Sequence, residues 1–236
     1  MKYWTLVISF FVAFATFAQK EKPLNYRRFD EKVIHFGFML GGNTADYSLF
    51  VKNDAFESHG VTSLIAQSTP GGQLGVVATL KCGTPVVRLR FIPSLSFQER
   101  VLNYKFIDDT YTGSVDNQER INSTSLDFPL MLQFRTLRIN NFAAYALVGG
   151  QYSVDLQSQA EANQDFVDPF IKMKRHDWHA QVGGGIEFFA TYFKFGLELK
   201  YSHGLVPSFI QDNTPVSRPI DNFYNRNWVI SLIFEG

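Results

Sequence analysis

The sequence contains a single cysteine, Cys82, so no disulfide can form within the chain. We interpret this thiol as a small packed side chain without a redox role. The chain also lacks an excess of either charge, with 22 Lys and Arg against 22 Asp and Glu among 236 residues, and it has no basic run. Proteins that bind nucleic acid need clustered cations to follow the phosphates, so this composition excludes such a surface.

An apolar run long enough for a membrane helix is missing after residue 18. The first 18 residues carry one positive charge, an apolar stretch and the small residues Thr16 and Ala18, which predict a secretory signal peptide cleaved after Ala18. An uncut membrane anchor is the alternative, although the stretch is short for a span. We expect a signal peptide at 1–18, a periplasmic leader at 19–32 and a barrel domain at 33–236. An exported chain can cross a bilayer as a closed β-barrel, because closure satisfies every backbone group.

Aromatic residues are abundant, at 16% of the chain with 24 Phe, and they recur at every second position. In "HFGFMLGGN", residues 35–43, Phe36, Phe38 and Leu40 fall on one face of a strand, and His35 and Met39 fall on the other. A similar alternation recurs in residues 71–82, 86–100, 123–135, 142–155, 176–189, 193–204 and 225–236. The pattern therefore predicts about eight strands, the smallest common number for a membrane barrel.

The expected connections alternate in length. Residues 45–70, 103–121, 155–175 and 203–225 are long and polar, whereas those at 83–85, 136–141 and 190–192 are short. An even strand number with short turns at one end and long loops at the other is typical of an outer-membrane barrel. We predict an all-β, eight-stranded antiparallel transmembrane β-barrel with long extracellular loops, short periplasmic turns and both termini in the periplasm.

Alternation alone does not say which face points inward, because a soluble ligand-binding barrel of the lipocalin kind carries the same pattern reversed. Volume favours the membrane barrel, since an eight-stranded barrel has an interior that side chains just fill. Four or five Phe, Leu, Ile or Trp side chains from each strand would overfill it, so we expect the aromatic face to contact lipid. The interfacial girdles are assigned to Tyr104, Tyr152, Trp178, Tyr192 and Tyr201.

The predicted inward face collects charges of both signs. Such charges must pair inside a narrow barrel or cost several kcal/mol each, so we expect a salt-bridged plug rather than an aqueous pore. The cluster assigned a structural role comprises Lys81, Arg88, Arg90, Arg100, Asp127, Arg135, Glu187, Lys194 and Glu198. The same face also carries Asp177, Lys200 and Glu235.

Two chemical alternatives are weaker. The "HDWH" segment suggests a metal site, but His176 and His179 point to opposite faces of a strand unless it bulges, so we expect no metal and no cofactor. A hydrolase at the outer rim would need a base within reach of a nucleophile or of paired carboxylates. The acids of the predicted loops, Asp108, Asp109, Asp165, Asp168 and Asp212, have no spacing that ties them to a His or Ser, so we predict no catalytic residues.

Several segments together resemble the PorT family of outer-membrane barrels from Bacteroidota. They are "FDEKVIHFGFMLGGN", "PGGQLGVVATL", "VVRLRFIPSLSFQERVLNYKF", "LDFPLMLQFR" and "VGGGIEFF" followed by "FKFGLELKYSHGL", which span residues 29 to 234. The segments "LDFPLML" and "GGGIEFF" are shared widely by barrels of that phylum. The more specific motif residues are His35, Gly37, Asn43, Arg90, Pro93 and Arg100.

The resemblance implies a role in the type IX secretion system, which exports proteins that bear a C-terminal sorting domain and supports gliding in motile species. It implies that the barrel is needed for export but is not the channel through which the proteins pass. It implies no catalytic residues. The partners expected are the outer-membrane lipid bilayer and other secretion-system envelope proteins, with no nucleic acid and no small-molecule substrate. The long loops or the leader, with "YRRFDEK", would be the contact surfaces. A small porin-like solute channel and an adhesin remain the alternatives.

Overall fold

The computed structural model describes residues 24–26, 29–55, 60–106, 118–158, 171–214 and 216–236. The predicted signal peptide at 1–18 and the first part of the predicted leader lie outside the described residues. In the described part of the chain, no helix has the length and apolar character needed to cross a membrane.

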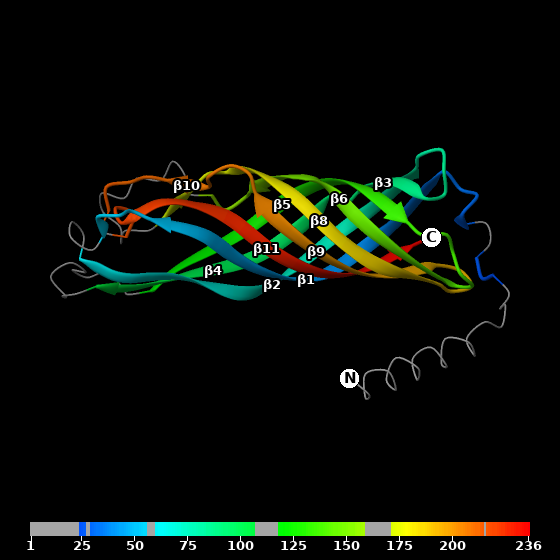
Figure 1. Ribbon diagram of the computed structural model, residues 1–236, viewed down its shortest axis with the longest axis horizontal. Coiled ribbons are helices and arrows are strands. Elements are labelled where there is room, and N and C mark those ends of the chain that lie inside the picture. Colours follow the sequence, from blue (N-terminus) through cyan, green and yellow to red (C-terminus); the bar gives the residue numbers. More distant parts are fainter. Residues whose placement is uncertain (1–23, 27–28, 56–59, 107–117, 159–170, 215) are drawn as a thin grey trace, which may run out of the picture.

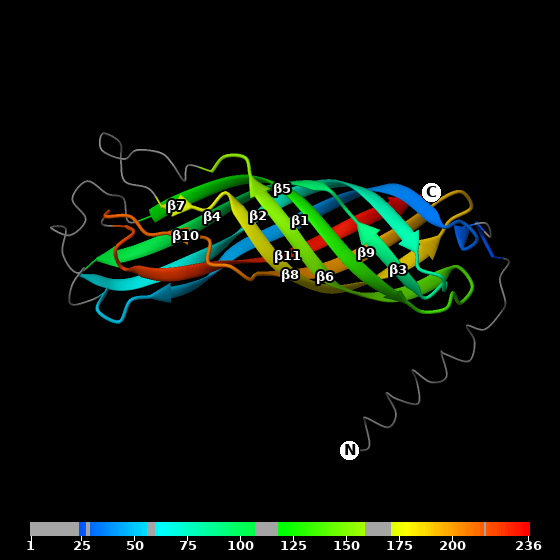
Figure 2. The same cartoon turned by 90° about the horizontal axis from the view of Figure 1, so that it is seen from above.

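The described chain forms antiparallel β-strands (Figures 1 and 2). Their bounds are β1 Ile34–Val51, β2 Val61–Lys81, β3 Val87–Phe91, β4 Ser94–Phe106, β5 Gln118–Arg135, β6 Phe142–Asp155, β7 Lys172–Met173, β8 His176–Phe189, β9 Lys194–Gly204, β10 Phe209–Ile210 and β11 Ile220–Glu235. Strands β7 and β10 pair only with each other, at the end of the molecule that carries the long loops.

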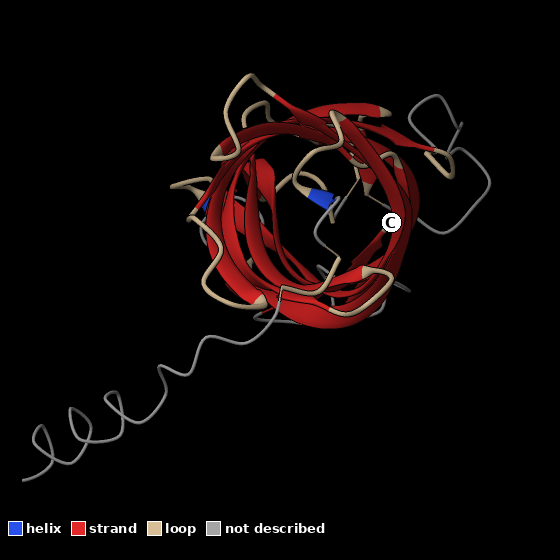
Figure 3. Cartoon of the chain, turned by 90° about the vertical axis from the view of Figure 1, so that its right-hand side faces the viewer, coloured by secondary structure: helices blue, strands red, loops and turns tan. Residues whose placement is uncertain are grey.

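The remaining strands close into a ring, which Figure 3 shows from the end with the short turns. The first strand pairs with both its sequence neighbour β2 and the last strand β11, and this pairing completes the closure. Strands β3 and β4 occupy one place in the wall, because both pair with β2 on one side and β5 on the other. They are separated by Ile92 and Pro93, whose backbone stays bonded to its neighbours. The predicted eight-stranded barrel is therefore confirmed.

Burial follows the predicted alternation. On β1, His35 and Met39 are 1% exposed, whereas Phe36 is 65% and Phe38 is 52% exposed. The polar and small side chains thus fill the interior, and the large apolar side chains cover the outside, as the volume argument required. Most large aromatic side chains of the strands therefore face outward, as predicted, whereas Tyr47, Tyr145 and Phe223 are buried inside.

The exposed apolar side chains form a band around the outside of the barrel. Four aromatic residues lie at the end of this band that is nearer the long loops. Tyr152 and Trp178 lie side by side with ring centroids 4.9 Å apart, and Tyr201 and Trp228 lie 4.8 Å apart. The girdle assignment of Tyr104 is wrong, because this residue is 2% exposed and points into the barrel. Its hydroxyl donates to the carbonyl oxygen of Val216 at 2.8 Å, a contact with a distant segment that strand periodicity does not reveal.

Several strands extend farther than the sequence predicted. Strand β1 continues to Val51 and β2 begins at Val61, although residues 45–70 were expected to form one loop. Likewise β4 reaches Phe106 and β5 begins at Gln118 within the predicted loop at 103–121. These extensions lie beyond the apolar band and carry more polar residues than it, so their composition resembles that of loops, although Phe50 and Ile65 are exposed on them.

Closure of the barrel requires a very close approach of β1 and β11 at Gly37. A Cβ atom at this position would collide with the backbone carbonyl of Phe234. We expect Gly37→Ala to lower the free energy of unfolding by about 1–3 kcal/mol, because the backbone must move to relieve the overlap. Urea titration of the protein in lipid vesicles measures this loss. Gly72→Ala is the matched control, since nothing lies within 4 Å of its added Cβ, and an equal loss in both variants would contradict the prediction.

Candidate functional site

The centre of the lumen is an ion-pair network built around Arg90 of β3. Its guanidinium lies 2.8 Å from the Glu198 carboxylate on β9, 3.4 Å from that of Glu235 on β11 and 3.6 Å from that of Glu187 on β8. All four side chains are at most 1% exposed. One cation therefore links β3 to β8, β9 and β11, which lie across the inside of the ring and far from β3 in the sequence.

A second set of groups completes the pairing of these carboxylates. Lys194 binds Glu187 at 2.7 Å and also contacts Glu235, and Lys200 lies 3.0 Å from Glu198. Neutral donors add to the network: the Tyr145 hydroxyl reaches Glu198 at 2.8 Å, the Thr79 hydroxyl reaches Glu235 at 2.5 Å, and the Gln133 amide reaches Glu187 at 2.9 Å. Buried charges are tolerated when their lone pairs and protons are satisfied in this way.

The mouth at the short-turn end is closed by residues of the predicted leader. Asp30 accepts from Arg135 at 2.6 Å and from Arg88 at 3.1 Å, and it lies 3.8 Å from Arg138. Its backbone carbonyl also accepts a hydrogen bond from Lys81 at 2.9 Å. Asp30 is the one carboxylate that ion-pairs with Arg88 among the described residues, so this buried arginine depends on the leader for its counter-ion.

Phe29 fills the same mouth beside Asp30 and is fully buried. Its ring stacks on the His35 imidazole at 3.8 Å and meets the Phe189 ring edge to face at 5.5 Å. The Lys194 ammonium lies 4.8 Å and the Arg88 guanidinium 5.3 Å from its ring centroid, both suited to cation–π attraction. Viewed along the barrel axis, part of this segment lies within the circle of strands (Figure 3). Phe29 is thus unavailable as a contact for a partner.

Charge at the mouth changes the acidity of Asp30. Burial raises the pKa of this carboxyl, but the hydrogen bond and charge of Arg135, together with the charges of Arg88 and Arg138, bring it below the ordinary value of 3.8. Asp30 therefore stays ionised at neutral pH and holds the leader against the arginines.

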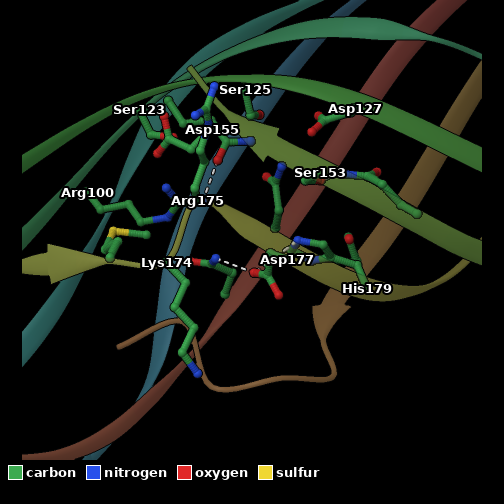
Figure 4. Close-up of a pocket in the computed structure, with 16 residues that line it drawn as sticks. Arg100, Ser123, Ser125, Asp127, Ser153, Asp155, Lys174, Arg175, Asp177 and His179 are labelled. Carbon is green, nitrogen blue, oxygen red and sulfur yellow. Dashed lines mark hydrogen bonds and ion pairs between the residues drawn. The ribbon is translucent and has the colours of Figure 1, made fainter. Parts of the chain in front are cut away.

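A polar chamber lies above the ion-pair network, toward the long loops (Figure 4). Its water-accessible volume is about 40 Å³, and part of the chamber is open to solvent. Asp177 is its best-bonded group, since it accepts from Asn225 at 2.6 Å, from Ser208 at 2.8 Å and from His179 at 3.2 Å. The chamber is lined mainly by Ser, Asn, Gln and charged residues, as expected for a hydrated compartment.

An apolar cluster closes the barrel above the chamber. Its centre is formed by side chains of the wall together with β7, β10 and the segment that precedes β11. Its buried members are Tyr47, Leu102, Tyr104, Ile171, Met173, Phe209, Val216, Ile220 and Phe223. The lumen is therefore filled at three levels by the leader, by the ion-pair network and by this apolar cap.

The structure brings most of the sequence-assigned lumen cluster together, but not all of it. Arg88, Arg90, Arg135, Glu187, Lys194 and Glu198 join the ion pairs described above. Arg100 and Asp127 face the lumen but make no ion pair with the described residues, and Lys81 binds a backbone carbonyl. Arg100 lies ten residues along the chain from Arg90, and its guanidinium sits over the Tyr47 ring at 5.2 Å. Strand periodicity predicts whether a side chain points into the lumen. It does not predict which charged residues of other strands lie at the same level along the barrel axis.

The motif residues carried by the family resemblance occupy structural positions. His35 packs on Phe29, Gly37 permits the β1–β11 approach, and Pro93 lies between β3 and β4. Asn43 donates to the Ser96 hydroxyl at 3.0 Å and to the Gly72 carbonyl at 3.2 Å.

The two histidines of "HDWH" point to opposite sides of the wall. His176 lies outside, with its Nδ1 2.7 Å from the Tyr152 hydroxyl, whereas His179 lies inside beside Asp177. Among the described residues, no group of three or more His, Cys, Asp or Glu could hold a metal ion. Of the loop acids considered for hydrolysis, Asp108, Asp109, Asp165 and Asp168 lie outside the described residues. Asp212 pairs with Lys172 at 2.8 Å.

Sequence reasoning missed the plug residues Phe29 and Asp30 and the buried hydroxyl of Tyr145. The signal for Tyr145 was present, because it shares the inward face of β6 with Ala143. Phe29 and Asp30 precede the first strand and belong to no alternation, so only the excess of basic residues at the short-turn end could have suggested a carboxylate nearby.

Comparison with known proteins agrees with this architecture. A family model described as an outer membrane protein beta-barrel domain matches residues 17–209, well over half of the chain. No curated protein matches the chain.

Among solved structures, OprG from Pseudomonas aeruginosa shares 16% identity over 86% of this chain and 93% of its own, with a TM-score of 0.49. The Ail attachment invasion locus protein of Yersinia pestis, solved with the heparin analogue sucrose octasulfate, shares 9% identity over 87% and 100%, with a TM-score of 0.39. Neisserial surface protein A shares 12% over 84% and 95%, with a TM-score of 0.39. At these identities the likeness concerns the fold alone. By its family match and its closed ring of strands, this chain belongs to the outer membrane protein β-barrel domain family, and the protein resides in the outer membrane.

Proposed function

We propose that this protein is a closed, non-enzymatic barrel that supports type IX protein secretion by assembling with other envelope components. The secretion role rests on the resemblance of its strands to the PorT family. The single observation that supports an assembling rather than a conducting role is the filled lumen. A channel needs a continuous aqueous path, and here leader, ion pairs and apolar cap lie one behind another.

Because the lumen is filled, we expect the protein not to conduct ions. Purified protein in planar bilayers is expected to give no large, stable current steps, because the charges at the centre of the lumen pair with one another instead of binding passing ions. A variant without residues 24–32 is also expected to give no stable current steps, since the ion-pair network and the apolar cap remain. Stable conductance of the full chain would contradict the proposal and favour the porin-like alternative.

The secretion role is tested by deleting the gene in its native host and comparing secreted and surface proteins by mass spectrometry. We expect proteins with C-terminal sorting domains to accumulate in the periplasm. Complementation with the unaltered gene should restore export, and complementation with the Arg120→Met variant should do the same, because this exposed side chain lies outside the lumen. An unchanged secreted set would overturn the secretion role and leave the fold assignment intact.

An adhesin is the second candidate, and one observation favours it. Strands β1, β2, β4 and β5 continue past the aromatic girdle and enclose the apolar cap, so the extracellular end is a stiff projecting rim rather than a set of soft loops. A deletion of residues 107–117, in the β4–β5 connection, is expected to abolish surface attachment while leaving export unchanged if this second role is the true one. The converse pattern supports secretion.

A further inference from the structure

The barrel wall is split near its extracellular end, between β1 and β2. These strands pair with each other only up to Ala45, opposite Thr69. Beyond that point, residues 46–51 of β1 pair with β11, and residues 61–68 of β2 pair with β4. Among the described residues, no strand pairs with the other edge of either segment. Two strand edges without a described strand partner thus face each other at this split in the wall.

The split lies outside the membrane. Trp228 of the aromatic girdle pairs with Thr44 of β1, one residue before the two strands separate. Interfacial aromatic residues sit at the level of the lipid headgroups, so the separated segments project into the extracellular space. Unpaired backbone groups at this level can be satisfied by water, or by another strand.

The free edge of β2 differs from the other free edges of the rim in having no charge. No Asp, Glu, Lys or Arg occurs between residues 61 and 80. The facing segment of β1 carries Asp46, which binds Arg226 at 2.6 Å. A third edge without a described strand partner, residues 118–123 of β5, extends past the pairing with β6 and carries Glu119 and Arg120. Charged side chains discourage the addition of a foreign strand to a sheet edge, so the β2 edge is the unprotected one.

Apolar surface lies directly behind this edge. Leu64 and Ala66 of β2, with Leu49 of β1 across the split, are partly buried and pack against the apolar cap. Ile65 points the other way and is 58% exposed. A strand added here would place alternate side chains against Leu49 and Leu64 and the others toward solvent.

We propose that residues 61–68 of β2 form a docking edge for an extended, uncharged peptide segment with apolar side chains at every second position. The segment adds to the rim as a further strand, and main-chain hydrogen bonds supply most of the contact. A second copy in the same membrane fits less well, because its β2 runs in the same direction and would pair in the less stable parallel arrangement. This inference is independent of the proposed secretion role.

Hydrogen exchange of the full-length protein in lipid nanodiscs tests the proposal. The probe is a ten-residue peptide of alternating valine and threonine, and the control is the same peptide with proline at its two central positions. We expect those amides of residues 61–68 that point away from β4 to exchange at least tenfold more slowly with the first peptide and to be unaffected by the second. Residues 118–123 should show no change. Absence of slowing at 61–68, or equal slowing at both edges, would overturn the proposal.

An edge variant separates docking from indirect stabilisation. Ile65→Lys places a charge on the exposed face of the edge and should reduce the slowing at least tenfold, whereas Gln118→Lys on the β5 edge should leave it unchanged. If hydrogen exchange at residues 61–68 slows with increasing protein concentration in the absence of peptide, the edge binds a second copy of the chain and the peptide proposal is overturned. The folded state of each variant is checked by its urea unfolding midpoint, so a loss of docking is not confused with a loss of structure.

Discussion

Replacing Arg90 by methionine is expected to lower the free energy of unfolding by about 3–5 kcal/mol. Methionine resembles the aliphatic part of the arginine side chain but carries no charge, so Glu187, Glu198 and Glu235 would lose the cation that they share. Lys194 and Lys200 remain, but neither reaches all three carboxylates in the described contacts. Urea unfolding in lipid vesicles measures the effect through the fluorescence of Trp178 and Trp228, which both face outward.

Two further variants define the cause of that loss. Arg90→Lys keeps the charge but cannot span several carboxylates at once, so we expect an intermediate loss of stability. Arg120→Met removes an exposed arginine that lies 3.6 Å from Glu99, and it should cost less than about 1 kcal/mol. If Arg90→Met and Arg120→Met unfolded at the same urea concentration, the network would not be the main electrostatic support of the lumen.

Asp30→Asn is expected to lower the free energy of unfolding by about 2–3 kcal/mol, because it leaves Arg88 buried without an ion-pair partner. Arg135 retains its contact with Glu187 at 3.1 Å, which limits the loss. The leader should also detach from the mouth, and exchange of the amides at residues 29–33 should become faster. Glu31→Gln is the matched control, since this neighbouring acid is exposed and has no ion pair in the described structure.

The Asp30 contact should depend on pH in a direction fixed by its pKa. The pKa in the folded protein lies below the ordinary value of 3.8, so the ionised form is favoured by folding. The stabilisation is therefore complete above pH 3.8 and is lost as the pH falls through the folded pKa. NMR spectra in detergent micelles should show the amides of residues 29–33 shifting over that range in the unaltered protein. The Asp30→Asn spectrum should stay constant there, and a parallel shift in both proteins would assign the change to another acid.

A filled lumen and an open rim suggest different uses for the two halves of this barrel. In the membrane half, the ion-pair network and the leader bind most of the buried charges, and of the lumen cluster Lys81, Arg100 and Asp127 make no ion pair with the described residues. The extracellular half has strand edges that no described segment covers. Interaction with other molecules is therefore expected at the rim, where backbone groups are exposed, rather than within the pore.

The sequence by itself determined the fold class and the orientation of the side chains. Strand residues alternate strictly between two faces, so the positions of Phe36, Phe38 and Arg90 relative to lipid and lumen follow from counting along the chain. The interior volume of an eight-stranded barrel then decided which face points inward. None of these steps needs contacts between distant residues.

Only the tertiary structure decided which charges meet and where the barrel closes. Strand periodicity carries no information on the height of a residue along the barrel axis, so it grouped Arg100 with Arg90 although only Arg90 reaches the carboxylates. The register between strands sets that height, and it depends on bulges such as the one between Ser68 and Gly72. The same holds for Phe29, Asp30 and Tyr104, whose partners lie far away in the sequence. Contacts across the ring form only once closure has fixed the distances between its walls.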